Sequence, residues 1–157
     1  LNIPPDKRGK IAKTDELTLD SFGRLLKRRF PKNLASDAKA TSSSEIDNEH
    51  LAKNIIEDDD SLYWQAASDD EEPEIVVDFG KPVNFDKLVL QENIATGQQI
   101  EEFSIYVKLG GKWKKIANET VVGHCRICRF KEVRAQYFKI VIEKARCFAT
   151  LERLEAY

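Results

Sequence analysis

The chain has 157 residues, of which 25 are basic and 27 acidic, so its formal net charge is −2. This length suits one domain with a short additional segment. The charge balance argues against a nucleic-acid-binding protein, which would present a strongly basic face. No run approaches the roughly 18 to 20 apolar residues of a membrane span. The chain opens at Leu1 and contains no Met, so we expect it to be a piece of a longer protein.

The first 32 residues are expected to contain a single α-helix. Between residues 15 and 29 the apolar residues recur near helical spacing, which is typical of an amphipathic helix. Acidic side chains come early and basic ones late, as the helix dipole favours. Thr14 or Asp15 is expected to cap the start, and Pro31 to stop the helix. The apolar positions are Leu17, Phe22, Leu25, Leu26 and Phe30.

After Pro31 the hydrophobic period changes to two, and short runs rich in Val, Ile and aromatic residues alternate with turn residues. This pattern predicts an all-β domain, an antiparallel β-sandwich, over residues 33–157. Gly110-Gly111 is a two-residue hairpin signal between two of the strands. The candidate strands are residues 38–42, 74–79, 85–92, 102–109, 112–117, 126–130, 137–143 and 151–157.

Three cysteines limit the metal and redox chemistry of the chain. Cys125 and Cys128 have the C-x-x-C spacing, but no second pair completes a four-ligand zinc site. In a strand, residues three apart point to opposite faces. We therefore interpret these two residues and Cys147 as ordinary buried thiols.

Residues 54–64, NIIEDDDSLYW, resemble the N-x-x-D-G-D-x-x-T-x-W signature of discoidin domains, also called coagulation factor V/VIII type C domains. Residues 76–82 look like the D-L-G-K-P segment of these domains, and residues 151–157 are similar to their last strand. The resemblance implies a galactose-binding-domain-like jelly roll. Many such domains bind sugars and are attached to bacterial glycoside hydrolases.

Residues 1–9, LNIPPDKRG, resemble the L-N-I-P-P-D-x-R-G motif near the end of the catalytic barrel in α-L-fucosidases of glycoside hydrolase family 29. The resemblance implies that residues 1–32 end a catalytic domain and that residues 33–157 form the discoidin-like domain after it. The catalytic Asp and Glu would then lie upstream, so this chain would hydrolyse nothing by itself. A bacterial enzyme in the periplasm or outside the cell is also implied, with its own barrel and fucosylated or galactosylated glycans as partners.

Discoidin-type sugar modules often hold a structural calcium, and the resemblance shows how its ligands would fall here. Asp59 is kept, but Leu62 stands where a Thr ligand belongs, and Arg153 stands where the last strand supplies a Glu. We expect no cofactor, with the Arg153 guanidinium in the calcium position and paired with Asp59 or Glu57. The alternative is that the acidic run 57–60 itself binds calcium.

A sugar site needs an aromatic face and a few fixed polar groups. Phe148 occupies a position where the resemblance implies a sugar-facing aromatic, whereas Trp64 is expected in the core. For two of the polar residues, Glu92 and Arg126, an internal salt bridge is the alternative. A purely structural module without a ligand is the alternative for the whole domain. The candidate carbohydrate-binding residues are Phe148, His124, Arg126, Glu92, Gln98 and His50.

Overall fold

The structure is a computed structural model, and it describes residues 3–157. The chain divides into two compact units between Lys32 and Asn33. Leu1 and Asn2, the first residues of the motif that resembles the fucosidase barrel, lie outside the described residues.

The first unit contains a turn and the predicted helix. Asp6 closes the turn by accepting the backbone N–H groups of Arg8 and Lys10 at 2.8 and 3.0 Å. Helix α1 covers Lys13–Arg29 and ends two residues before Pro31, as predicted. The predicted cap is wrong, because the helix begins after Ala12 and no side chain caps it. Among the residues that the structure describes, no helix is long and apolar enough to cross a membrane.

The apolar stripe of α1 is uncovered. No residue within Lys13–Arg29 is buried, and Phe22, Leu25 and Leu26 are each more than 40% exposed. At 3.6 residues per turn these three side chains and Leu19 fall within an arc of about 120°. Leu17 lies outside that arc, although it is also exposed.

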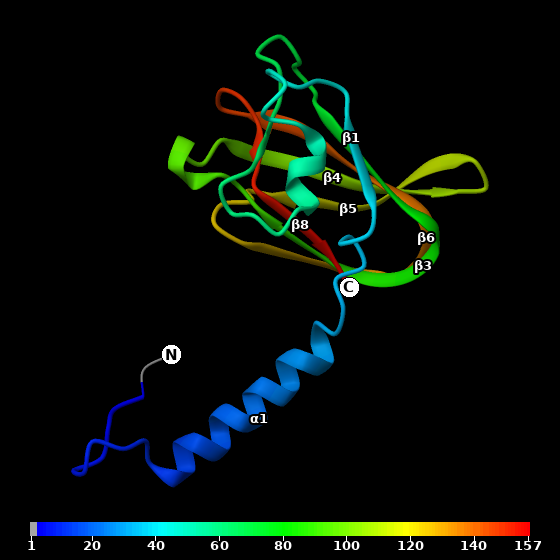
Figure 1. Cartoon of the computed structure of the whole chain (residues 1–157). Coiled ribbons are helices and arrows are strands. Elements are labelled where there is room, and N and C mark those ends of the chain that lie inside the picture. The colour runs from blue at the N-terminus through cyan, green and yellow to red at the C-terminus, as the bar shows by residue number, and fades with distance from the viewer. Residues whose placement is uncertain (1–2) are drawn as a thin grey trace. The chain divides into compact units, whose positions relative to one another are not determined.

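The second unit is the predicted antiparallel β-sandwich (Figure 1). Both glycines of the β4–β5 hairpin turn, Gly110 and Gly111, have positive φ, as the predicted two-residue turn requires. The strands are β1 (Lys39–Ser42), β2 (Trp64–Gln65), β3 (Glu74–Gln91), β4 (Ile100–Leu109), β5 (Lys112–Thr120), β6 (Arg126–Ala145), β7 (Thr150–Leu151) and β8 (Arg153–Ala156), and two 3₁₀ turns are η1 (Ala52–Ile56) and η2 (Ile94–Thr96).

Strands β3 and β6 each run through both layers of the sandwich. The first part of β3 pairs with β1 and with the last part of β6, and there β6 also pairs with β4. The last part of β3 pairs with the first part of β6 and with β8. The register shifts between Asp78 and Val83, where Gly80 has a φ of +73°. The sequence predicted two separate strands in place of each long one, because the residues at the bend have the pattern of a strand end.

The core lies between the two layers and is largely aromatic and aliphatic. Trp64 is fully buried, as predicted, and its indole Nε1 donates to the carbonyl of Ser44 at 3.0 Å. The rings of Phe79, Phe85 and Phe138 pack with centroids 5.3 to 5.7 Å apart.

Candidate functional site

Three loops gather at the end of the sandwich where β4 begins. They are residues 92–99, 121–125 and 146–149, which Figure 1 shows on its left side as the connections after β3, β5 and β6. Backbone hydrogen bonds join them: Arg146 N–H donates to Gln99 at 2.9 Å, and Glu92 N–H donates to Gly123 at 3.0 Å. We call this group of loops the loop end.

Glu92 holds the loop end together from inside. Its side chain is buried, and Oε1 accepts the backbone N–H groups of Gln99 and Ile100 at 2.5 and 2.8 Å. The second oxygen, Oε2, accepts the N–H of Gly123 at 3.0 Å. A carboxylate bound by three backbone donors satisfies its charge within the protein. The carboxylate of Glu92 therefore contacts the backbone of the loops and not solvent.

The alternative of a salt bridge between Glu92 and Arg126 is wrong. Arg126 pairs instead with Glu119, and the hydrogen bond between these two groups raises the pKa of Arg126. Gln98 is exposed, and its amide oxygen lies next to Gly123, 3.4 Å from the place where a Cβ atom of that residue would be. Glu92 and Arg126 are therefore engaged with different partners.

The remaining three predicted residues, His50, Phe148 and His124, each contact different parts of the domain. The imidazole of His50 packs at a tilt against the ring of Tyr63, with 4.3 Å between the centroids, and its Nδ1 lies 2.8 Å from Asp47. Phe148 is half-buried next to Ala149, whose carbonyl accepts the N–H of Ala66. His124 is exposed and lines a hollow of about 350 Å³ that contains none of the other five predicted residues.

Arg153 lines that hollow and contacts three acidic residues, of which Asp60 and Glu155 also line it. One guanidinium nitrogen, Nη1, lies 3.3 Å from Asp58 and 3.9 Å from Glu155, and Nη2 donates to Asp60. Burial, the largest single effect, lowers the pKa of Arg153, but the two Asp carboxylates outweigh it and the net shift is upward. The other side chains that line the hollow are Gln91 and Glu152.

The predicted partners of Arg153, Asp59 and Glu57, are therefore wrong. Asp59 is engaged locally, because its Oδ1 accepts both the N–H and the hydroxyl of Ser61 at 2.9 and 2.6 Å. These hydrogen bonds, the hydroxyl one first, lower the pKa of Asp59. Residues 57–61 form a bend and a turn rather than a strand. In this turn Asp58 and Asp60 pair with Arg153, whereas Asp59 bonds to Ser61.

The residues around Arg153 do not fit a calcium ion. A guanidinium already lies among the carboxylates, and residues 3–157 contain no group of three His, Cys, Asp or Glu side chains placed to hold a metal. A calcium ion would need six to eight oxygen ligands at the place where Arg153 supplies only donors.

We accordingly propose that Arg153 replaces calcium, and we expect millimolar Ca²⁺ to leave the melting temperature of the chain unchanged. Arg153→Gln leaves the Asp carboxylates without their cation, so it is expected to lower the free energy of unfolding by about 1 kcal/mol. Thermal unfolding with and without Ca²⁺ measures both effects. A Ca²⁺-dependent rise in the melting temperature of the unmodified chain would contradict the proposal.

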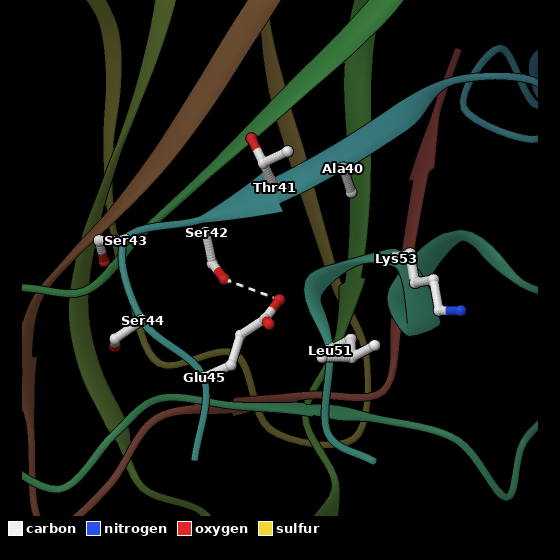
Figure 2. Close-up of a pocket in the computed structure, with 8 residues that line it drawn as sticks. All are labelled: Ala40, Thr41, Ser42, Ser43, Ser44, Glu45, Leu51 and Lys53. Atoms are coloured by element: carbon white, nitrogen blue, oxygen red, sulfur yellow. Dashed lines mark hydrogen bonds between the residues drawn. The ribbon is translucent and has the colours of Figure 1, made fainter. Parts of the chain in front are cut away.

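A second hollow, of about 540 Å³, lies between β1 and η1 (Figure 2). Glu45, its one acidic side chain among the described residues, is engaged: Ser42 donates to it at 3.2 Å, and the same Glu45 oxygen accepts the N–H of Ala52 at 2.7 Å. Among residues 3–157, no aromatic side chain lines it, and Figure 2 shows the Lys53 ammonium turned away from Glu45. This hollow lacks the stacking face that a sugar site needs.

The cysteines are free thiols and do not act together. Cys128 is buried, and burial raises the pKa of its thiol to about 12. Cys125 and Cys147 are exposed, so the prediction of buried thiols is wrong for these two. Cys125 lies in the loop before β6, where the strand periodicity does not apply.

Comparison with known proteins places the β-sandwich in a family. The model of the F5/8 type C domain matches residues 39–153. The chain is 30% identical over 163 residues to "Alpha-L-fucosidase 1" of Arabidopsis thaliana, and the match covers 100% of the chain and 32% of that protein. It is 29% identical over 150 residues to "Putative alpha-L-fucosidase 1" of rice, Oryza sativa subsp. japonica, covering 93% and 29%. The chain thus spans about a third of the length of these relatives.

Solved structures agree with this assignment. The chain superposes on SpGH29 with a TM-score of 0.85 at 25% identity, covering 100% of the chain and 34% of that structure. For the GH29 fucosidase E1_10125 of Ruminococcus gnavus in complex with fucose, the TM-score is 0.84 at 28% identity, with 100% and 32% covered. Chitosan-binding module 1 from Paenibacillus sp. IK-5 shares the fold alone, at 20% identity and a TM-score of 0.72 over 80% of the chain and 98% of the module. The chain therefore belongs to the F5/8 type C domain family, with α-L-fucosidases as its relatives and GH29 fucosidases among its structural neighbours.

Proposed function

We propose that this chain is the C-terminal third of an α-L-fucosidase and that its β-sandwich is an accessory domain that supports the catalytic domain. The observation that carries the proposal is the match of the whole chain, helix and sandwich together, to about a third of the plant fucosidases. A bacterial source and a place in the periplasm or outside the cell stay predictions, since the curated relatives are plant proteins.

The acidic residues support a role without catalysis by this chain. Retaining glycoside hydrolysis needs two carboxyl groups about 5 Å apart on either side of the scissile bond. Asp58 and Asp60 are exposed and tied to Arg153. In the second acidic run, Asp70 accepts the hydroxyls of Ser43 and Ser44 at 2.6 Å each. Burial, the largest single effect, raises the pKa of Asp70, but its hydrogen bonds outweigh it and the net shift is downward, opposite to that of a general acid.

The uncovered apolar stripe of α1 supports the proposal that this helix packs against another domain. Phe22, Leu25 and Leu26 are 47%, 41% and 42% exposed, and together they form a contiguous apolar face. Apolar faces of this kind mark interfaces in soluble proteins. In our proposal, the occupant is the catalytic domain of the same polypeptide, and α1 is its last helix.

Phe22→Ser in the complete fucosidase tests this role. We expect fucosidase activity to fall together with a loss of about 2 kcal/mol in stability, because a buried aromatic is removed from the proposed interface. Lys27→Ser, on the opposite side of α1, is the matched control and is expected to change stability by less than about 0.5 kcal/mol. Activity on a chromogenic fucoside and thermal unfolding measure both. Equal behaviour of the two variants would overturn the proposal.

A second candidate function is contact with a neutral glycan at the loop end. The hollow beside His124 favours it, because hydrogen-bonding side chains from four segments converge there. The loop end lacks an aromatic face in that hollow, so the support role remains the leading proposal. The neutral-sugar arm of the titration described below tests this candidate through shifts at His124.

A further inference from the structure

A third hollow lies at the opposite end of the sheet from the loop end. Its volume is about 530 Å³, and it is formed by the β4–β5 hairpin and the middle of β6. Strand β4 has 10 residues, which separates its two ends by about 30 Å. We call this hollow the hairpin hollow. Nothing in the proposed support role requires it.

The hairpin hollow has an aromatic wall. Tyr137 lies half-buried on the outer face of β6 and lines the hollow beside Leu109 and the two turn glycines. An ideal Cβ at Gly110 or Gly111 would meet nothing within 4 Å, so the turn backbone is open to a ligand. The volume falls within the range of about 300 to 1,000 Å³ that small-molecule sites occupy.

Two cations line the hollow without a carboxylate partner. Lys108 Nζ lies 5.5 Å from the ring centroid of Tyr137 and 5.6 Å from that of Trp113. Among residues 3–157, neither Lys108 nor Arg134 forms an ion pair, and no Asp or Glu lines the hollow. Packing between two rings holds the ammonium in place, which lowers the entropic cost of binding an anion.

Other lysines on the same face show that this arrangement is selective. Lys115 lies 5.4 Å from the ring of Tyr106 but pairs with Glu143 at 2.8 Å. Lys139 lies over the same ring and pairs with Glu74 at 2.5 Å. Their charge is neutralised inside the protein, whereas the charge in the hairpin hollow is left for a ligand.

Asp78 is the partner of Tyr137 in the β3–β6 ladder. Burial, the largest single effect, raises its pKa, but hydrogen bonds from Gln136, Gly80 and Tyr137 outweigh it and the net shift is downward. The carboxylate accepts the N–H of Gly80 at 2.7 Å and the side-chain amide of Gln136 at 2.9 Å, and it does not line the hollow.

We propose that the hairpin hollow binds a sugar that carries a carboxylate, a uronic acid of a glycan. Arg134 and Lys108 would pair with the carboxylate, and the Tyr137 ring would pack against the pyranose. A planar guanidinium fork matches a carboxylate, and an aromatic ring covers the apolar face of a sugar. A neutral sugar would leave both cations unused, and a small inorganic anion would leave the aromatic wall unused.

The test is a titration of the 157-residue chain, followed by NMR, with tri-galacturonate, the matched neutral galactotriose, fucose and inorganic sulfate. We expect tri-galacturonate to bind with a dissociation constant near 1 mM, with shifts at residues 108–111 and 134–137. Neutral sugars and sulfate are expected to bind at least tenfold more weakly there. Raising the salt concentration is expected to weaken the binding of tri-galacturonate, since its ion pairs with the protein would be exposed to solvent.

Variants separate the parts of the hairpin hollow. The affinity for tri-galacturonate is expected to fall about fivefold in Lys108→Gln and in Arg134→Gln. The matched control is Lys115→Gln, because Lys115 is paired with Glu143, and it is expected to change the affinity less than twofold. Tyr137→Phe keeps the ring and the affinity. The three cations are exposed and Tyr137 is half-buried, and thermal unfolding confirms that each variant folds. Equal affinity for the neutral trisaccharide, or for sulfate alone, overturns the proposal, as does binding that survives Arg134→Gln unchanged. Shifts confined to His124 support the neutral-glycan candidate instead.

Discussion

Glu92→Gln is expected to lower the free energy of unfolding by about 3 kcal/mol. The buried carboxylate accepts backbone N–H groups from Gln99, Ile100 and Gly123. A Gln amide has one oxygen and an NH₂ group, so at least one backbone N–H would face another donor. An unsatisfied buried group costs about 1 to 3 kcal/mol, and more when a charged partner is lost.

Urea unfolding of the chain, followed by tryptophan fluorescence, measures this loss. Glu132→Gln is the control, because Glu132 is exposed and, within residues 3–157, its side chain forms a single hydrogen bond, accepted from Asn84 at 3.5 Å. It is expected to change stability by less than about 0.5 kcal/mol. If Glu92→Gln lowered the stability as little as its control, the three hydrogen bonds to Glu92 would not stabilise the loop end as the geometry indicates.

Trp64→Ala is expected to have the larger effect, about 3 to 5 kcal/mol. The side chain is fully buried between the layers, and its indole N–H satisfies the carbonyl of Ser44. Removing it leaves a cavity and an unpaired carbonyl together. Strand β2, which begins at Trp64, also pairs with β7, so the loss should loosen the segment around Phe148.

The second tryptophan supplies the matched control. Trp113 is half-exposed on the outer face, with Lys108 and Lys139 at 5.6 and 5.3 Å from its ring. Trp113→Ala removes surface packing and cation–π contacts, so its expected cost is about 1 kcal/mol. Calorimetric unfolding of both variants compares them directly. Similar losses from the two substitutions would contradict the assignment of Trp64 as the central core residue.

Most of the fold was predictable because its signals are local. Period-two apolar runs mark β4 and β5, and the Gly110-Gly111 turn joins them as expected. The N-terminal helix was predicted from its spacing and charge. The bends of β3 and β6 were not, since Gly80 and the residues near it read as strand ends although the backbone continues through them.

The candidate site was harder to predict, because side-chain partners depend on contacts between distant loops. Glu92 looks like any polar residue before a turn, and only the fold brings Gly123 onto its second oxygen. Asp58 and Asp60 lie in a bend and a turn between η1 and β2, so no strand periodicity indicates which carboxylates of the acidic run pair with Arg153. Lys108 and Arg134 carry no motif, and the topology alone places them at one hollow.

The passage of β3 and β6 through both layers has a consequence for folding. Neither layer has an independent pair of central strands, because the same two strands pair with each other in both. An intermediate with one layer formed and the other open would have to break these strands at their bends. The β4–β5 hairpin is local and closes early, whereas β3 and β6 must find each other across it, a distant contact that slows the rate-limiting step. The sandwich is therefore built to unfold as one cooperative unit, and a break in either long strand should be felt in both layers.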